Sequence, residues 1–409
     1  MKLSAVKDSC LQRTKNRLRP AFHTTHTTKM KTEIKPVTSQ NDLKVFIQLF
    51  YDLYRDCPNA VPYLYNDEVS TLSKDKNPAF AFCEAAYFLA YQGGKVVGRI
   101  AGIINHRANE YWKRKIVRFG WFDFIDDADV SRSLLNAIEK WGKDKGMTET
   151  AGPFGFEDMD REGMLVSGFD TISTMYINYN YPYYPQHIEA MGNFRKDNDY
   201  VEYGIQVPGQ APERMLKIAE MIGKRYNLQV RKFTRDELIK GRRGQELFNI
   251  LNITYKDLYG FSQLSASQID KLVNDYIRYA DLNLVTCVVD ANDNDKMVGF
   301  GVSFPSFSEA LRKTHDGRLL PFGWWPLLKV LKWHNTDIVD LLLIGVLPEY
   351  RSKGANALIF TDLIDWYRRY HFKLAVTGPQ MESNKAVLNQ WQYFDASEIR
   401  RHRIYCKDI

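Results

Sequence analysis

The chain has 409 residues, 44% of them hydrophobic and 26% charged, which is an ordinary globular composition with enough length for two or three domains. Its formal net charge of +7 lies entirely in residues 1–31, which hold eight Lys or Arg and one acid, Asp8. The rest of the chain carries equal numbers of basic and acidic residues. This balance argues against a basic nucleic-acid surface on the folded body, so we expect no nucleic-acid partner.

The cysteines and the hydropathy of the chain indicate in which cellular compartment the protein is expected. The cysteines are odd in number and lack C-x-x-C spacing, so the pattern predicts neither a metal site nor a disulfide framework. They are Cys10, Cys57, Cys83, Cys287 and Cys406. No apolar run approaches the roughly 20 residues that span a bilayer, and the N-terminal stretch lacks the apolar segment of a signal peptide. We therefore expect a cytoplasmic protein without metal and without stable membrane insertion.

Residues 1–32 read as a separate basic region, rich in Arg and Thr and poor in acids. The favoured interpretation is a disordered tail, or an over-long reading frame whose true start is Met30. An organelle transit peptide has the same composition and is the alternative. Ordered structure is predicted to begin at Glu33.

The first structured half alternates short strands and helices. Its first helix has apolar residues at helical spacing and a capping residue at Ser39 or Asn41. The sequence Gln92-Gly93-Gly94 between two β-rich runs is a hairpin signal. The expected elements are a strand at 33–37, a helix containing Leu43, Phe46, Ile47, Phe50 and Leu53, strands at 87–90, 96–104 and 116–124, a helix at 130–145, and a strand ending at Gly152.

The second half repeats this order, and some of the letters repeat as well. Lys95-Val-Val-Gly corresponds to Lys296-Met-Val-Gly, and Gly152-Pro153 to Gly378-Pro379. The pattern predicts two copies of one domain, at residues 33–207 and 208–409, with a Pro/Gly-rich boundary after Val207. The expected elements are a helix at 246–259, strands at 284–289, 297–304 and 338–346, a helix at 354–370, and a strand at 374–378.

The stretch from Ile344 to Asn356 carries the most chemical information. It reads Ile-Gly-Val-Leu-Pro-Glu-Tyr-Arg-Ser-Lys-Gly-Ala-Asn, an aliphatic strand that turns into a helix near Gly354. The first main-chain N–H groups of a helix lack partners within it, and they favour an anion there. Glycine lets a phosphate approach without a Cβ in the way, and Arg351 and Lys353 add positive charge. The pattern predicts a phosphate-binding turn.

These residues resemble the V-x-P-x-Y-R-x-x-G-x-G/A signature of the GNAT superfamily of N-acyltransferases. The resemblance implies that the loop amides bind the pyrophosphate of acetyl-CoA or another acyl-CoA. It also implies that the preceding strand pairs with the pantetheine arm, and Gly345 within that strand suggests a bulge or a close approach. Asn356 departs from the usual Gly or Ala. The implied acyl-CoA contacts are Ile344, Val346, Arg351, Ser352, Lys353, Gly354, Ala355, Asn356 and Asn384.

The corresponding turn of the first half has no glycine and three acids instead, Asp126, Asp127 and Asp129. Carboxylates repel a diphosphate, so this half is predicted not to bind CoA. An acidic cap of the following helix explains the three residues more simply than a metal site.

Candidate catalytic residues follow from the same resemblance. GNAT enzymes often carry an Asn, matched here by Asn384, and seven residues later a Tyr that protonates the CoA thiolate. Trp391 stands at the Tyr position, and its indole N–H is no useful acid. Tyr393 is then the candidate acid, and Asp340 or His334 is the candidate base. The alternative for each is an ordinary surface or packing role.

Two further stretches have open interpretations. The long connection between residues 304 and 338 contains Phe322-Gly-Trp-Trp325, and its aromatic helix is interpreted as docking against the first domain, or else as lining an apolar pocket. The tyrosine run at residues 178–185 adjoins Glu157-Asp-Met-Asp160. Tyrosines beside carboxylates suit an ammonium-bearing substrate, and turn packing is the equal alternative.

We expect an α+β fold of two GNAT-like domains, each a mixed, mostly antiparallel sheet flanked by helices, with acyl-CoA in the second. The tandem arrangement resembles a bacterial group and, distantly, the N-myristoyltransferases. The expected activity is transfer of an acyl group, expected to be acetyl, to an amine-bearing small molecule or peptide. The transfer is expected to be direct, because Cys287 and Cys406 lack an evident base. The alternatives are an aminoacyl-tRNA-dependent transferase and a non-catalytic CoA-binding module.

Overall fold

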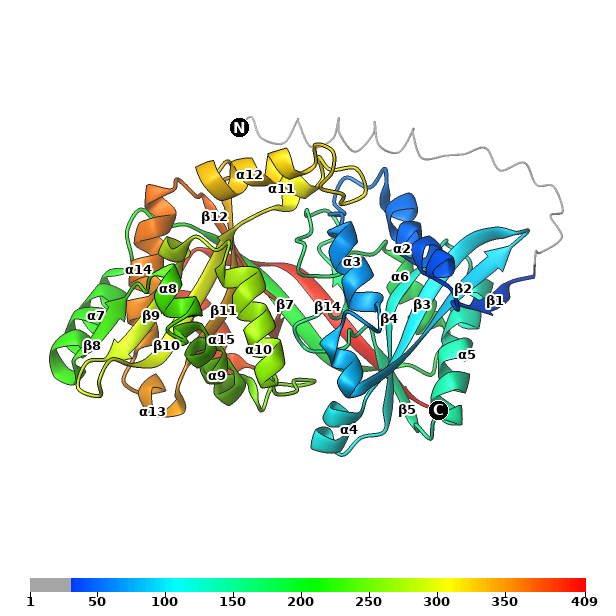
Figure 1. Ribbon diagram of the computed structural model, residues 1–409, viewed down its shortest axis with the longest axis horizontal. Coiled ribbons are helices and arrows are strands. Elements are labelled where there is room, and N and C mark those ends of the chain that lie inside the picture. The colour runs from blue at the N-terminus through cyan, green and yellow to red at the C-terminus, as the bar shows by residue number, and fades with distance from the viewer. Residues whose placement is uncertain (1–30) are drawn as a thin grey trace, which may run out of the picture.

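The computed structural model describes residues 31–409, apart from the side chains at positions 275 and 386. The predicted basic tail lies outside the described residues except for its last two positions. The described chain forms one continuous sheet with helices packed against it, and the sheet falls into two halves that lie side by side (Figure 1).

The first half confirms the predicted strands and helices and adds α3, α4, β6, α6 and β7, which were not predicted. Its elements in chain order are β1 (Glu33–Pro36), α2 (Gln40–Tyr54), α3 (Tyr65–Leu72), β2 (Cys83–Gln92), β3 (Lys95–Asn105), α4 (His106–Trp112), β4 (Ile116–Phe124), α5 (Ala128–Asp144), β5 (Glu149–Gly152), β6 (Met164–Ser167), α6 (Tyr183–Ala190) and β7 (Arg195–Gln206).

The second half confirms its predicted core in the same way. Its elements are α7 (Glu213–Tyr226), β8 (Leu228–Arg231), α8 (Arg235–Ile239), α9 (Arg243–Tyr255), α10 (Ala266–Leu272), β9 (Val285–Asp290), β10 (Lys296–Pro305), α11 (Ser308–Leu311), α12 (Trp324–Trp333), β11 (Ile338–Val346), α13 (Pro348–Arg351), α14 (Asn356–Arg369), β12 (Leu374–Thr377), β13 (Gln380–Met381), α15 (Lys385–Leu388) and β14 (Ala396–Asp408).

Local sequence explains where these elements begin. Ser39 caps α2 with a capping box, in which the Ser39 hydroxyl accepts from the Asp42 amide at 3.1 Å and the Asp42 carboxylate accepts from the Ser39 amide at 3.0 Å. Both hairpins of the repeat turn through two residues of positive φ, Gly93-Gly94 in one half and Asn294-Asp295 in the other. Paired positive φ angles match the twist of the flanking strands, and Gly, Asn and Asp tolerate them best.

Replacing Ser39 with Ala is expected to lower the free energy of unfolding by about 1 kcal/mol, because one side of the capping box is lost. Urea unfolding of the two proteins measures the difference. Asn41→Ala is the control, since Asn41 is exposed in the first turn of the same helix and is not its capping residue. Equal effects of the two substitutions would show that the box adds nothing.

The predicted duplication is visible in the strand order. The first half runs β2-β3-β4-α5-β5 and the second runs β9-β10-β11-α14-β12. The sheet order is β1-β2-β3-β4-β5-β14-β7-β12-β11-β10-β9-β8. Pairs β4–β5 and β11–β12 are parallel, and the other described pairs of this sheet are antiparallel. The predicted α+β class with mostly antiparallel sheets is confirmed.

The two halves exchange their last strands. β7, which ends the first half in sequence, pairs with β12 of the second half, and the C-terminal β14 pairs with β5 of the first. β7 and β14 also pair with each other along most of their lengths. This exchange was not predicted, and the domain limits expected at residue 207 remain a prediction. Separating the halves would break a sheet ladder, so they are held as one unit.

Each half has its own apolar core. The first packs α2 and α5 against β2–β4, and the second packs α9 and α14 against β9–β11. A small third cluster joins them at the exchanged strands, and it contains Ile116, Phe154, Tyr200 and Ile404. None of the described helices is long and apolar enough to cross a bilayer.

The expectation that the aromatic helix of the long connection docks against the first half is wrong for its aromatic residues. Contacts to the first half come from the segment before α12: the Ser308 hydroxyl donates to the Ser173 carbonyl at 2.9 Å, and the Tyr65 amide donates to the Gly317 carbonyl at 3.2 Å. Trp324, Trp325 and Trp333 are exposed. The helix is held by Val330 and its apolar neighbours, which leave the indoles in solvent.

Candidate active site

Strands β11 and β12 run parallel at one end and part at the other. Pairing joins Ile338–Leu341 to Leu374–Thr377, and it ends where the Gly378 amide donates to the Leu341 carbonyl at 2.9 Å. Among the described strands, none pairs with residues 342–346 on this side, while β10 pairs with their other side. Five strand residues span about 16 Å. An open main-chain edge of this length can pair with an extended ligand.

The bulge expected at Gly345 lies three residues earlier. The register between β10 and β11 shifts between Val302 and Ser303, so that Leu342 is the extra residue. Gly345 is paired normally with Phe300. A Cβ at Gly345 would come within 2.7 Å of the Phe300 ring, so close packing accounts for the glycine. The bulge itself falls where β11 and β12 part.

The open edge leads into the predicted phosphate turn. Pro348 begins α13, Gly354 has a φ of 85°, and α14 begins at Asn356. The positive φ requires a residue without a Cβ, and α7 packs against the same spot, with Ile222 only 3.1 Å from where a Cβ would lie. The turn therefore presents the N-terminus of a 14-residue helix at the end of the open strand edge.

The polar residues of the turn are partly held by the protein and partly free to face a ligand. Arg351 donates from Nε to the Val346 carbonyl at 3.0 Å and is otherwise exposed, as is Ser352. The Lys353 ammonium lies 4.0 Å from the Tyr350 ring centroid. Asn356 donates from Nδ2 to the side chain of Gln390 at 3.2 Å, while Ala355 is buried. Arg351 and Lys353 thus place two cationic side chains at this end of the helix, beside the exposed hydroxyl of Ser352.

The matching place in the first half is closed by its own chain. β4 and β5 also part, after Arg118, but the Phe154 amide donates to the Phe119 carbonyl at 2.8 Å and fills the opening. A Cβ at Gly120 would come within 2.1 Å of the Phe154 carbonyl oxygen, so no ligand fits beside it. The predicted acidic cap is present, because Asp127 accepts from the Asp129 amide at 2.8 Å.

Asp340 is the candidate base that the structure places at the opening of the strands. It lies on β11 directly before the last paired residue, and it is 3% exposed. Beyond the nearby Ser306 hydroxyl, its carboxylate oxygens have no hydrogen-bond partner among the described residues. Burial raises the pKa of Asp340 to about 7, against the opposing influence of Ser306 and Arg400. A carboxylate with such a pKa can accept a proton near neutral pH.

The other predicted residues lie apart from this point. Tyr393 is exposed, with the Arg214 guanidinium of α7 5.1 Å from its ring. Asn384 caps the single turn α15 and accepts from the Val387 amide at 3.4 Å. Trp391 is buried and donates to the Gln380 side chain at 2.7 Å. His334 stacks on Tyr370 with ring centroids 3.7 Å apart, and its Nε2 lies 2.8 Å from the Asp281 carboxylate.

A cavity of about 160 Å³ is lined by residues of the first half together with Tyr276 of the second. One lining residue is Tyr176, whose pKa is raised by burial and, to a smaller extent, by the charge of Asp340. Asp160, Arg161, Asn178 and Tyr276 also line it. The cavity is close in size to one of about 150 Å³ that holds a benzene molecule. It can therefore take a group of about six heavy atoms.

The predicted pairing of tyrosines with carboxylates is partly present at this cavity. Tyr179, Tyr184 and Asp160 line it. The Tyr179 hydroxyl donates to the Phe169 carbonyl at 2.9 Å, so its polar end is used in packing. Burial raises the pKa of Asp160, while the Glu157 and Phe156 amides lower it. Packing thus occupies the hydroxyl of Tyr179. The carboxylates that line the cavity have partners as well: Asp123 pairs with Arg99, Glu68 pairs with Arg161, and Asp160 accepts from the Phe156 and Glu157 amides.

A buried polar group on the exchanged strands was missed in the sequence. Arg400 on β14 pairs with Glu202 on β7 at 2.5 Å, and His402 Nδ1 lies 4.0 Å from the same carboxylate. His402 Nε2 lies 3.0 Å from the carbonyl of Asn178, which lines the cavity. Burial lowers the pKa of His402. The only sign of this buried group in the sequence was the presence of charged residues within a strand pattern. The sequence does not show the strand exchange that buries them.

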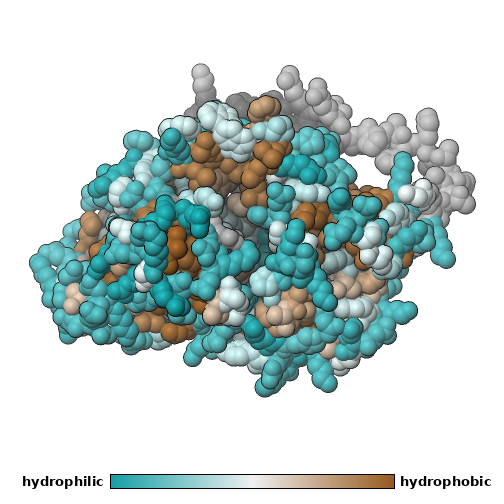
Figure 2. Space-filling model, in the orientation of Figure 1, coloured by the Kyte–Doolittle hydropathy of each residue, from teal (hydrophilic) through white to brown (hydrophobic). Residues whose placement is uncertain are grey.

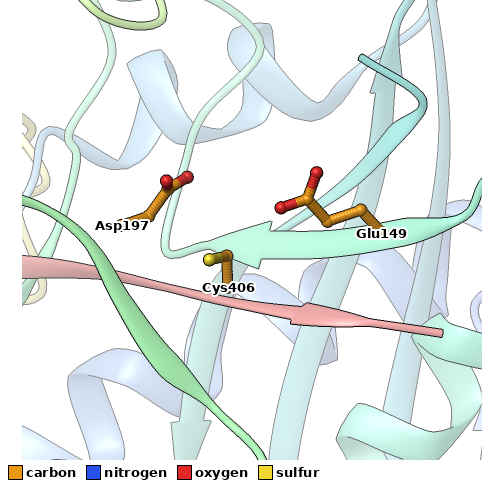
Figure 3. A group of neighbouring side chains, drawn as sticks. All are labelled: Glu149, Asp197 and Cys406. Carbon is orange, nitrogen blue, oxygen red and sulfur yellow. The ribbon is translucent and has the colours of Figure 1, made fainter.

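Three potential metal ligands gather at the far end of the exchanged strands (Figure 3): Glu149, Asp197 and Cys406, with ligand atoms within 4.8 Å of one another. The Arg114 guanidinium bridges the two carboxylates, with Nε 3.0 Å from Glu149 and Nη1 3.0 Å from Asp197. Burial raises the pKa of the Cys406 thiol to about 11, so it stays protonated. The group is satisfied as an ion-pair cluster.

Comparison with known proteins places this geometry in context. No family model matches the chain. It is 29% identical to Protein YghO of Escherichia coli strain K12, covering 92% of this chain and 95% of that protein. It is 27% identical to a bacterial ceramide synthase of Caulobacter vibrioides, covering 91% and 97%. A solved tandem GNAT protein from the clavulanic acid biosynthesis pathway superposes with a TM-score of 0.53 at 12% identity, covering 92% and 98%. The chain therefore has the tandem GNAT fold.

Proposed function

We propose that the protein is an acyl-CoA-dependent N-acyltransferase that joins a fatty acyl group to the amine of a long-chain amino alcohol, the reaction by which a ceramide is formed. The observation that carries the proposal is the open edge of β11, with a buried carboxylate at one end and a cationic helix N-terminus at the other. An acyl-CoA has the same order of groups, because its thioester and its diphosphate lie at opposite ends of the pantetheine arm.

Acyl-CoA binding uses the second half alone. The pantetheine arm pairs with residues 342–346, including the main chain of Ile344 and Val346. The pyrophosphate binds at the N-terminus of α14, near the amides of Ala355 and Asn356, beside Arg351, Ser352 and Lys353. Gly354 contributes the space for its approach, since its own amide donates to the Arg351 carbonyl at 3.1 Å. The thioester then lies near Leu341, where the strands part. Asn384 has no assigned contact in this arrangement, and its predicted cofactor role stays a prediction.

The acceptor class rests on sequence similarity and on the cavity. One relative, 27% identical over nearly the whole chain, is a bacterial ceramide synthase. The cavity next to Tyr176 holds about one amino-alcohol head group and no long chain. The aromatic rings of Tyr179 and Tyr184 in its lining can attract an ammonium group. The head group therefore binds in the cavity, with its amine directed towards Asp340.

The chemistry is a direct transfer. Asp340 accepts a proton from the acceptor ammonium, and the free amine attacks the thioester carbonyl. The C–S bond then breaks, the nitrogen's second proton passes to the departing sulfur, and CoA leaves as the thiol. A thiolate is already a good leaving group, so the assignment of Tyr393 as its acid stays a prediction that Tyr393→Phe tests. Direct transfer needs no cysteine nucleophile. Burial raises the pKa of the Cys287 thiol to about 12, so this thiol stays protonated and is a poor nucleophile.

The test incubates the purified protein with palmitoyl-CoA and sphinganine and follows both the released thiol and the amide by mass spectrometry. Acetyl-CoA replaces palmitoyl-CoA in a parallel series, because an acetyl donor is the expectation from the sequence. Ethanolamine replaces sphinganine to test whether the long chain matters. Amide formation with sphinganine supports the proposal. Acyl-CoA binding without amide from any amine would instead identify a non-catalytic binding protein.

A further inference from the structure

Five large apolar side chains gather in the connection between β10 and β11 and face solvent. Their exposed fractions are 79% for Leu320, 78% for Phe322, 42% for Trp324, 44% for Trp325 and 54% for Trp333. We refer to these five residues as the aromatic patch. Figure 2 shows hydrophobic side chains gathered at the top of the molecule, where Figure 1 places α11 and α12. Scattered exposed apolar residues are ordinary, but a contiguous group of this kind marks a binding surface.

Contacts within the patch and beneath it hold these side chains in place. Trp325 makes an edge contact with Trp324 at 5.6 Å and with Trp333 at 6.1 Å between ring centroids. The inner side of α12 packs Leu327, Val330 and Leu331 against the second core. The segment before the patch is fixed to the first half by Arg318, whose guanidinium lies 3.5 Å from the Tyr65 ring centroid. The exposed side chains are thus presented by a framework that joins both halves.

The charges around the patch favour a lipid surface over a protein partner. Residues 317–336 contain no Asp or Glu, and they contain Arg318, Lys329 and Lys332. Lys329 and Lys332 lie 5.3 and 5.2 Å from the ring centroids of Trp325 and Trp333. Lysine is depleted from protein interfaces, whereas exposed Trp, Phe and Leu interleaved with Lys are typical of surfaces that lie in the boundary of an anionic bilayer.

We propose that the aromatic patch docks the protein on the surface of an anionic lipid bilayer, with the indoles at the headgroup level and Lys329 and Lys332 against lipid phosphates. This proposal goes beyond the proposed function and does not depend on it, because docking needs no turnover. It does suit an acceptor with a long chain, since the cavity next to Tyr176 has room only for a head group. The docking is peripheral and requires no membrane-spanning helix.

The test is co-sedimentation of the full chain with vesicles of phosphatidylcholine alone and of phosphatidylcholine with phosphatidylglycerol. We expect binding to both, tighter on the anionic vesicles, with a blue shift of tryptophan emission. The combined variant Phe322→Ser, Trp324→Ser, Trp325→Ser and Trp333→Ser should lose at least about tenfold in partition to both. The variant Lys329→Glu with Lys332→Glu should lose only the preference for anionic lipid. The control Tyr111→Ser, Met221→Ser and Tyr279→Ser removes exposed apolar groups elsewhere and should bind as wild type.

Neutral vesicles separate the patch from the basic N-terminal region, which has charge but few apolar residues. Absence of wild-type binding to neutral vesicles, together with equal binding of wild type and the serine variant to anionic ones, would assign all binding to that region and overturn the proposal. A concentration-dependent dimer that the serine variant abolishes, with no vesicle binding, would instead show that a second copy covers the patch. Circular dichroism of each variant establishes that it is folded.

Discussion

Replacing Asp340 with Asn is expected to lower kcat of acyl transfer by about 10²–10⁴-fold, because the amide cannot accept a proton from the acceptor ammonium. The pKa of Asp340, raised to about 7 by burial, sets the pH dependence. Wild-type kcat should rise about tenfold per pH unit below pH 7 and level off above it. The variant should show no such limb. Thiol release followed across this range, at saturating acyl-CoA, measures both.

The pH dependence of the free energy of unfolding tests the Asp340 carboxyl independently of activity. A carboxyl whose pKa is raised in the folded state holds its proton more tightly there than in the unfolded chain, so the folded state loses stability as pH rises from about 4 to about 7. Asp340→Asn removes this loss, and the variant should be at least as stable as wild type at pH 8. A variant that is stable and inactive is therefore not simply misfolded.

Asp337→Asn is the matched control, because Asp337 is exposed just before β11 and pairs with Lys373 at 2.8 Å. It should leave kcat within about twofold of wild type, since exposed ion pairs contribute little. Full activity of Asp340→Asn would place the base elsewhere and would leave the role of the buried carboxylate as structural. Loss of activity in both variants would point to a general effect on β11.

Replacing Asn356 with Asp is expected to weaken acyl-CoA binding by about tenfold or more, which corresponds to about 1.4 kcal/mol. The new carboxylate lies at the N-terminus of α14, where it repels a pyrophosphate. The same position favours an acidic side chain in the free protein, so the fold should be retained. Calorimetric titration with palmitoyl-CoA and with CoA itself measures the dissociation constants.

Gln40→Glu adds the same charge to the first turn of α2, where no anion is proposed to bind, and should leave both dissociation constants unchanged. Equal binding by wild type and Asn356→Asp would remove the pyrophosphate from α14. If the wild type bound no acyl-CoA at all, the aminoacyl-tRNA-dependent alternative would become the leading one, although the body of the chain carries no excess of basic charge to attract tRNA.

Much of the fold could be predicted from the sequence because it depends on near neighbours along the chain. The cap at Ser39, the hairpin turn at Gly93-Gly94 and the helical spacing of apolar residues in α2 are local signals, and each was found at its place. The phosphate turn is local too, since strand, Pro348, glycine and helix follow one another directly. The bulge suggested at Gly345 lies at Leu342 instead. The glycine is explained by the Phe300 ring packed against it, a contact between strands that are far apart in the sequence.

The sequence by itself determined that the chain is two copies of one α+β plan. It also determined that, of the two, only the second has a glycine turn with Arg351 and Lys353 at the start of a helix, because both features are written in contiguous residues. Only the tertiary structure decided the rest. Pairing of β7 with β12 joins segments about 170 residues apart, and pairing of β14 with β5 joins segments about 255 residues apart. A strand pattern does not specify such a partner. Burial in that joined sheet gives Asp340 its raised pKa, and the way α12 packs leaves its indoles in solvent, because solvation depends on what the rest of the fold covers.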